Sequence, residues 1–293
     1  MDEQDRLAER FEAHRSHLRA VAYRLLGSLS EADDAVQETW LRLSRSDAGR
    51  VENLPAWLHT VVSRLCLDML RSRSARREEP IDRQPVHQVR DDGGGDPEGE
   101  AVLIDSVGRA LLVVLDTLAP AERIAFVLHD AFAVPFDQIA PVVERSPATA
   151  KKLASRARHK VRGTPAVSAD GLAAQRRVVD AFLAAARDGD LEALLTVLAP
   201  DVVRRADRAA LPPGVPTTSR GARAVAEETR VLGRRARFAA PALVNGSVGV
   251  VVAPRGRLLL ALTFTVEDGR IAAYEVIADP VRLRGLELAV LDG

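Results

Sequence analysis

The sequence predicts a multidomain protein with two all-α modules, the second containing a helix-turn-helix, followed by an α+β domain with a curled antiparallel sheet. Apolar residues recur at helical spacing as far as residue 162, apart from one segment without any periodicity. Strand-like runs occur only in the last third of the chain. Helices that precede antiparallel strands are typical of the α+β class. We therefore expect domains at residues 1–77, 102–163 and 170–293, with a flexible acidic linker at 78–101.

The composition is that of an ordinary globular protein, and 293 residues are enough for two or three domains. The single cysteine, Cys66, allows no internal disulfide bond and no cysteine cluster for zinc, and its apolar surroundings predict a small core residue. The N-terminal stretch lacks an apolar signal core, and no run reaches the ~18 apolar residues of a membrane span. We expect a cytoplasmic protein without a membrane partner, a metal or a cofactor.

The first two helices are expected at residues 11–26 and 30–44, because apolar residues recur there on one side. In the second helix these inward residues are Val36, Trp40 and Leu43.

A third helix is expected after Asn53, which suits an N-cap, with Pro55 in the first turn. Its apolar stripe is expected at Leu58, Val61, Leu65 and Met69. Further helices are expected at residues 102–118 and 121–132.

The formal net charge is zero, but the charges are segregated along the chain. A basic run at the end of the third helix is followed by a segment rich in Pro, Gly and acids, from Glu78 to Asp105. The stretch from Lys151 to Arg162 is again basic and contains no acid. Local fields decide where a polyanion binds, so the zero total does not exclude a nucleic-acid partner.

Residues 134–162 predict a helix-turn-helix. A short helix at 136–143 is followed by a turn, then by Ser146 at the N-cap and Pro147 at the first helical position. The second helix carries an apolar stripe opposite a basic face, as in helices that enter a DNA major groove. A solvated basic helix is the alternative for this segment alone. The stripe consists of Ala150, Leu153, Ala154, Ala157 and Val161.

Beyond residue 163 the pattern changes from helices to strands. Helices are expected at residues 172–187, 190–198 and 220–232, and strands at 242–253, 257–267 and 270–277. The last two strands are joined by an Asp-Gly pair, which is a hairpin signal.

Three motifs, DDAVQETWLR, LPAWLHTVVSRLCLDMLR and SPATAKKLASRARHKVR, resemble regions two and four of bacterial sigma factors of the extracytoplasmic-function group, within the sigma-70 family. The resemblance covers residues 11–163. The following part, with ARDGDLEALLTVLAPDVVRRAD and EDGRIAAYEVIADPVRL, resembles a SnoaL-like cone domain fused to such a sigma factor. The resemblance implies a transcription initiation factor, not an enzyme, whose partners are core RNA polymerase and promoter DNA.

The resemblance implies three sets of binding residues, near residue 38, along the third helix and on the last helix of the helix-turn-helix. The polymerase-binding set is Asp34, Gln37, Glu38 and Arg42. The set for the −10 element, read as melted strand, is Asn53, Trp57, Arg64, Arg71 and Arg73 with the loop before Asn53. The set for the −35 element is Ser146, Thr149, Lys151, Lys152, Ser155, Arg156 and Arg158. Trp57 suits a stacking role and core packing equally well.

The chain departs from the family pattern at two places. The family has glycine in the helix-turn-helix turn where Glu144 stands, so we expect this turn to differ slightly. Fused cone domains of this kind read Asp-Gly-Gly-Gly-Lys where this chain has residues 207–211, Asp-Arg-Ala-Ala-Leu. We expect the contact of the cone domain with the sigma module to be altered there.

The cone domain is poorly equipped for acid–base catalysis. Its candidate carboxylates are Asp201, Asp207 and Glu275, and all six histidines precede residue 160. Its cavity is expected either to be filled or to hold a small apolar ligand. We expect the domain to modulate sigma-factor activity, and its apolar C-terminal tail to pack on the sigma module or the linker.

Two other functions account for part of the sequence. A stand-alone transcription regulator accounts for the helix-turn-helix but not for the DDAVQETW and LPAWL motifs. The second alternative is a SnoaL-like polyketide cyclase or isomerase-type enzyme, or a ligand-binding regulator, with a DNA-binding extension. It accounts only for the C-terminal third.

Overall fold

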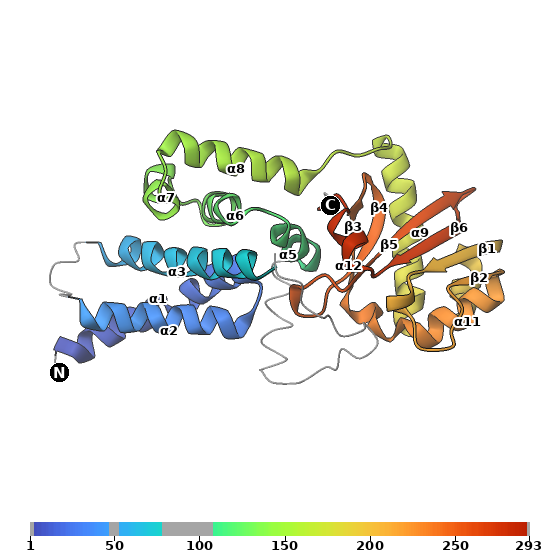
Figure 1. Ribbon diagram of the computed structural model, residues 1–293, viewed down its shortest axis with the longest axis horizontal. Coiled ribbons are helices and arrows are strands. Elements are labelled where there is room, and N and C mark those ends of the chain that lie inside the picture. The colour runs from blue at the N-terminus through green and yellow to red at the C-terminus, as the bar shows by residue number, and fades with distance from the viewer. Residues whose placement is uncertain (1–2, 47–52, 78–107, 292–293) are drawn as a thin grey trace. The chain divides into compact units, whose positions relative to one another are not determined.

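The computed structural model describes residues 3–46, 53–77 and 108–291, which form two compact units (Figure 1). The helical unit contains the described parts of Met1–Asp82 and Leu115–His159. The sheet unit contains Gly108–Val114 and the described residues from Lys160 onward. The expected linker at 78–101 and the loop residues 47–52 lie outside the described residues. The ends of the predicted second helical module thus belong to the same unit as the C-terminal domain.

Three long helices begin the helical unit, as the apolar spacing predicts. They bury one continuous set of side chains, to which Phe11 and Trp40 contribute with ring centroids 5.1 Å apart. Thr39 is also buried, and its hydroxyl donates to the carbonyl of Ala35 at 2.7 Å. The bounds are α1 (Glu3–Leu26), α2 (Leu29–Arg45) and α3 (Leu54–Arg77).

The buried side of α3 differs from the predicted stripe. Leu58 is buried as predicted, but Val61, Leu65 and Met69 are only partly buried. The helix contacts α1 and α2 and also α6 and α7, so its buried surface is wider than one stripe and is shifted by one position. The buried apolar residues are Leu54, Leu58, Val62, Cys66, Leu67 and Leu70. Cys66 is a core residue, and burial raises its thiol pKa to about 12.

The second half of the helical region is built from shorter elements. The helix predicted at 121–132 is divided into an α-helix and one π-helical turn, which ends before Ala133 with a positive φ of 54°. Both helices of the predicted helix-turn-helix are present. The bounds are α5 (Arg109–Asp116), α6 (Pro120–Phe126), η3 (Val127–Ala131), α7 (Phe136–Val143) and α8 (Pro147–Arg162).

The sheet unit combines helices α9, α10 and α11 with one seven-stranded sheet in the order β2-β1-β6-β5-β4-β3-β7. Asp190 caps α10 through a hydrogen bond from the N–H of Ala193 at 3.0 Å. The helices are α9 (Ala169–Asp188), α10 (Leu191–Val197) and α11 (Ala222–Leu232). The strands are β1 (Leu198–Ala206), β2 (Thr218–Arg220), β3 (Ala239–Val244), β4 (Ser247–Val252), β5 (Leu260–Glu267), β6 (Arg270–Ile277) and β7 (Leu288–Ala289).

The α+β class is confirmed, but the sheet is mixed because β1 runs parallel to β6. The predicted hairpin between β5 and β6 has Asp268 and Gly269 at positive φ, as a two-residue turn requires. The run predicted as one strand at 242–253 is two antiparallel strands, joined by Asn245 and Gly246 at positive φ. Strands β1, β2 and β7 were not predicted.

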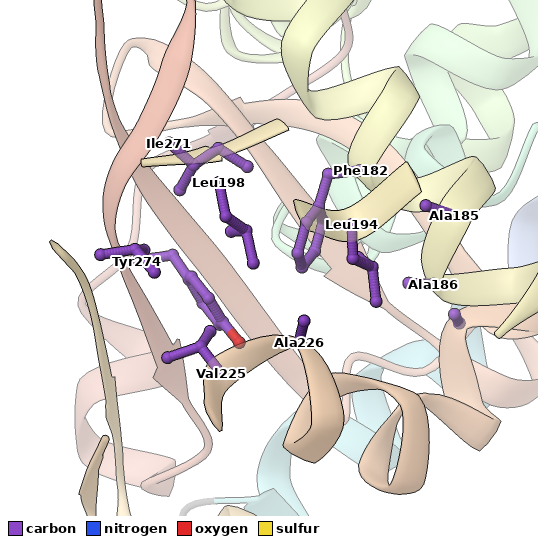
Figure 2. Close-up of a cluster of buried hydrophobic side chains, with 11 residues drawn as sticks. Phe182, Ala185, Ala186, Leu194, Leu198, Val225, Ala226, Ile271 and Tyr274 are labelled. Carbon is purple, nitrogen blue, oxygen red and sulfur yellow. The ribbon is translucent and has the colours of Figure 1, made fainter. Parts of the chain in front are cut away.

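Helix α9 lies against the concave sheet and contributes to two apolar clusters (Figure 1). In one cluster Phe182, Leu194 and Tyr274 point toward one another from α9, α10 and β6 (Figure 2). The rings of Phe182 and Tyr274 are 5.5 Å apart. The second cluster lies along β4 and includes Val248 and Val250. Together these clusters form the core of the sheet unit.

The C-terminal tail packs mainly on its own sheet, through the short helix α12 (Pro280–Arg284) and β7. Leu283 is buried with Ala261 and Ile277, while Val281 is 68% exposed. One bond also reaches the end of α8, since the N–H of Val290 donates to the carbonyl of Val161 at 2.8 Å. Both residues belong to the sheet unit, so the expected packing of the tail on the sigma module or the linker stays a prediction. None of the helices in the described ranges has the length and apolar character that crossing a bilayer requires.

A pair of histidines joins α1 to α3. His17 and His59 bring their Nε2 atoms within 2.8 Å, and the ring of Phe132 meets His17 edge-on at 5.3 Å. Burial lowers the pKa of His59 to about 4, and the neighbouring His17 adds to this shift. The folded protein therefore keeps this imidazole neutral at neutral pH.

We predict that the helical unit loses stability as the pH falls from 6.5 toward 4. In this window the unfolded chain binds a proton that the folded His59 excludes, so protonation favours unfolding. His59→Gln should flatten the dependence of the urea midpoint on pH. His159→Gln, an exposed change on α8, should leave the dependence as it is. An equally steep slope for His59→Gln would assign the effect to another group.

Candidate nucleic-acid and polymerase interfaces

The turn between α7 and α8 has a backbone conformation that normally suits glycine. Glu144 has φ 56° and ψ 45°, and its N–H donates to the carbonyl of Ala140. A non-glycine residue in this left-handed region costs roughly 1–2 kcal/mol. Glu144 thus adopts at this turn the left-handed conformation that glycine adopts without strain.

Helix α8 begins at the residue that the sequence predicts. The Ser146 hydroxyl accepts a hydrogen bond from the N–H of Thr149 at 3.3 Å and lies 3.0 Å from the Thr149 hydroxyl. Such a cap satisfies one of the free N–H groups of the first turn. Ser146 is exposed and Thr149 is partly buried. On the inner side of the helix, Ala150, Ala154, Ala157 and Val161 are buried.

The outer side of α8 presents a basic face, which we define as Lys151, Lys152, Ser155 and Arg156. All four side chains are exposed, and the helix contains no acidic residue. Two ammonium groups, a guanidinium group and a hydroxyl can contact phosphates and base edges in a groove.

Arg158 has a different environment from the basic face. Its Nε and Nη2 atoms donate to the two carboxylate oxygens of Asp130 at 2.8 and 2.9 Å. This bidentate pair fixes α8 to η3. Arg158 therefore holds the recognition helix in place, which the sequence pattern did not indicate.

Two cations of the −10 set contact α7. Arg64 donates to the carbonyl of Pro141 at 3.0 Å, and Arg71 lies 3.5 Å from Glu144. Both side chains are exposed, so these are surface contacts that a phosphate can replace. The structure thus brings the third helix of region two against the first helix of the helix-turn-helix.

Arg73, by contrast, is partly buried in a structural contact. Its Nε donates to Glu31 at 3.1 Å, and its Nη1 donates to the carbonyl of Leu26 at 2.9 Å. These bonds join α3 to the junction of α1 and α2. Asn53 caps α3 as predicted, by accepting from the N–H of Ala56 at 3.1 Å. Trp57 is partly buried, so both interpretations of its role stay open.

The outer side of α2 presents an acidic face, which we define as Asp34, Gln37, Glu38 and Arg42. Asp34 and Gln37 are exposed, and Glu38 accepts from Arg42 at 3.0 Å within the helix. The opposite side is buried, including Val36 and Leu43 as predicted, while Trp40 is partly buried. The acidic face therefore lies on the outer side of a helix whose opposite side is packed in the core of the unit.

Two of the candidate carboxylates of the C-terminal domain, those of Asp207 and Glu275, form ion pairs within the domain. Asp207 accepts from the N–H groups of Ala278 and Asp279, both at 2.9 Å, and pairs with Arg282. Burial would raise the pKa of Asp207, but these hydrogen bonds outweigh it and keep the pKa below its usual value. Glu275 also pairs with Arg282, at 2.9 Å.

A group of polar side chains that is not among the predicted site residues lies inside the C-terminal domain. Arg204 is buried and pairs with Glu228, and Tyr274 bonds to Thr229. The alternation of buried and exposed residues along β1 points to this group, because Val202, Arg204 and Ala206 share the buried side. Arg204, Glu228, Thr229 and Tyr274 line a cavity of about 710 Å³, and none of the three candidate carboxylates lines it. The described residues contain no group of three or more side chains that could hold a metal ion.

Comparison with known proteins finds two family profiles, Sigma-70 region 2 over residues 10–76 and Sigma-70, region 4 over residues 108–161. The chain is 39% identical over 296 residues to the ECF RNA polymerase sigma factor SigJ of Mycobacterium tuberculosis, covering 95% of this chain and 93% of the relative. It is also 39% identical over 212 residues to the probable ECF RNA polymerase sigma factor SigI of that species, covering 71% of this chain and 72% of the relative.

A crystal structure of the Mycobacterium tuberculosis sigma factor SigJ aligns with 34% identity over 95% of this chain and 98% of that one, with a TM-score of 0.43. The full-length similarity to SigJ extends through the C-terminal domain, so it favours a sigma factor over an enzyme with a DNA-binding extension. The helix-turn-helix, the α2 and α3 surfaces and these relatives agree: the chain belongs to the family of extracytoplasmic-function RNA polymerase sigma factors.

Proposed function

We propose that this sigma factor uses three separate surfaces: the acidic face of α2 for core RNA polymerase, the α3 cations for the −10 element and the basic face of α8 for the −35 element. The observation that carries the proposal is that both faces are exposed on helices whose opposite sides are buried. We place the surfaces in domains at residues 1–77 and 102–163, and we propose a cytoplasmic protein.

The −35 surface is the basic face together with Ser146 and Thr149 at the helix start. The N-terminal part of a recognition helix contacts base edges, and lysines farther along contact phosphates. Arg158 contributes indirectly, because its pair with Asp130 fixes the helix.

The −10 surface requires an exchange of partners. Arg64 and Arg71 contact α7 in the free protein, at Pro141 and Glu144. Phosphates of a melted strand would compete for the same two guanidinium groups. Arg73 keeps its bond to Glu31 and positions α3, while Asn53 and Trp57 lie at the start of the helix.

The C-terminal domain, residues 170–293, is proposed as a non-catalytic modulator. Its candidate carboxylates Asp207 and Glu275 are engaged with Arg282, and Asp201 is exposed outside the cavity. The cavity itself is large enough for a small apolar ligand. The domain is linked to region four, because Gly108–Val114 and Lys160 onward share one compact unit.

We predict that Lys151→Ala, Lys152→Ala and Arg156→Ala together weaken promoter binding by the holoenzyme. Each lost phosphate contact lowers the salt slope by about 0.9, so the slope of log K against log salt should fall by about 2.7. Fluorescence anisotropy across a KCl series measures this. Arg6→Ala with Arg10→Ala, which removes exposed charges from α1, is the control. Loss of core-polymerase affinity with intact DNA binding would refute the role of α8.

We predict that Asp34→Lys with Glu38→Lys abolishes run-off transcription without lowering the melting temperature. The double change breaks only the exposed pair with Arg42, which contributes little to folding, while it reverses the charge of the docking face. Glu9→Lys with Glu12→Lys is the matched control on α1, where an exposed pair with Arg15 is lost. Normal transcription by the α2 variant would contradict the proposed polymerase contact.

We predict that truncation after Gly163 lowers run-off transcription. It removes the Val290 N–H from the carbonyl of Val161 and the contacts of Arg109 with Ala253 and Phe238. Both ends of region four then lose support, and a bias of 1–3 kcal/mol corresponds to about a 5- to 150-fold change. Activity equal to that of the full chain, with retained helicity by circular dichroism, would leave the domain without this role.

A further inference from the structure

The cavity in the sheet unit is bounded by α9, α11, the η5 segment (Gly233–Phe238) and the inner faces of β4, β5 and β6. Its volume of about 710 Å³ lies in the range of pockets that hold small organic ligands. Most of its wall is apolar, including Phe182, Leu183, Val250, Leu260 and Leu262. A ligand must therefore have an apolar body.

The polar groups on one side of the cavity satisfy one another. The Thr229 hydroxyl donates to the carbonyl of Val225 at 2.8 Å, so its single proton is used. Tyr274 must then donate its own proton to the Thr229 oxygen, 2.9 Å away. Burial raises the pKa of Tyr274 to about 12, so this proton stays in place at neutral pH.

The guanidinium group of Arg204 also has hydrogen-bond partners within the protein. Its Nη2 lies 2.5 Å from Glu228 Oε2, and its Nη1 donates to the carbonyl of Pro216 at 3.0 Å. Separating a buried ion pair is costly, because one charge is then left without compensation. A ligand should leave this pair intact.

The charge balance of the cavity is nevertheless positive. Among the described lining residues the charged ones are Arg204, Glu228, Arg235 and Arg237, and Glu228 is already matched to Arg204. Arg235 and Arg237 stand on η5, where the Arg237 guanidinium lies 4.6 Å over the ring of Phe238. Burial lowers the pKa of Arg235, which indicates that water solvates its charge poorly. Both arginines take part in further interactions, so an incoming anion would join an existing network.

We propose that the cavity binds an apolar carboxylic acid in its anionic form, with the hydrocarbon body against α9 and the sheet and the carboxylate at Arg235 and Arg237. A cation is disfavoured by the three guanidinium groups, and a neutral ligand can accept hydrogen bonds from them but lacks the charge attraction that an anion gains. This inference rests on the proposed ligand site of the C-terminal domain and names the chemical class of the ligand.

The test compares decanoate with decanamide, which has the same chain but no charge, by calorimetry on the full-length protein. Decanoate should bind at least tenfold more tightly, which corresponds to about 1.4 kcal/mol. Arg235→Gln with Arg237→Gln should abolish this preference and leave decanamide binding unchanged. Arg205→Gln, an exposed change on β1 outside the cavity wall, should alter neither.

Two cavity-filling variants establish where the probes bind. Val250→Trp should abolish binding of both probes, and Ala186→Leu, a milder filler from α9, should weaken both if the tryptophan variant fails to fold. Equal affinity for decanoate and decanamide would overturn the inference and leave the apolar-ligand proposal standing. Decanoate binding that survives both fillers would place it outside the cavity and overturn the inference. If neither probe binds, both proposals fail.

Discussion

Arginine–carboxylate pairs connect separate elements in both units and position those elements on one another. Arg73 joins α3 to Glu31 of α2, and Arg158 joins α8 to Asp130 of η3. In the sheet unit Arg204 joins β1 to Glu228 of α11. Arg158 bonds its carboxylate at two points, and such directional bonds help to set the position of one element on another. Lys151, Lys152 and Arg156, which we propose for nucleic acid, lie outside these three pairs.

This division explains how a chain of zero net charge can bind DNA. Acids and bases are equal in number, but several arginines are neutralised by carboxylates of other elements, as in the pairs Arg73–Glu31, Arg158–Asp130 and Arg204–Glu228. The exposed side of α8 is left with Lys151, Lys152 and Arg156 and no acid, so its local field is positive. The exposed side of α2 has the opposite character at Asp34 and Glu38. One folded unit thus presents two exposed surfaces of opposite charge.

In the C-terminal domain, too, carboxylates are paired with an arginine. Asp207 and Glu275, which resemble catalytic carboxylates in the sequence, close the chain around Arg282. The cavity is lined instead by arginines, a matched glutamate and apolar side chains. Asp207 and Glu275 are engaged with Arg282, and neither carboxylate lines the cavity.

The sequence by itself determined the features that depend on neighbouring residues. Helical spacing located α1, α2, α7 and α8, Ser146 and Pro147 marked the start of α8, and Asp268-Gly269 marked a hairpin. These signals are local, because a cap or a two-residue turn is decided by side chains within one turn of the backbone. The family motifs likewise identified the acidic and basic faces, since each lies on one helix.

Only the tertiary structure decided which of the predicted site residues are engaged in contacts between elements. Arg158 meets Asp130 across 28 positions and Arg73 meets Glu31 across 42, and no local pattern encodes either contact. The buried side of α3 is shifted by one position because α6 and α7 cover it, and two adjacent apolar stripes fit the sequence equally well. Strands β1, β2 and β7 form because partners distant in the chain supply their hydrogen bonds. The cavity and its arginines follow from that same long-range pairing.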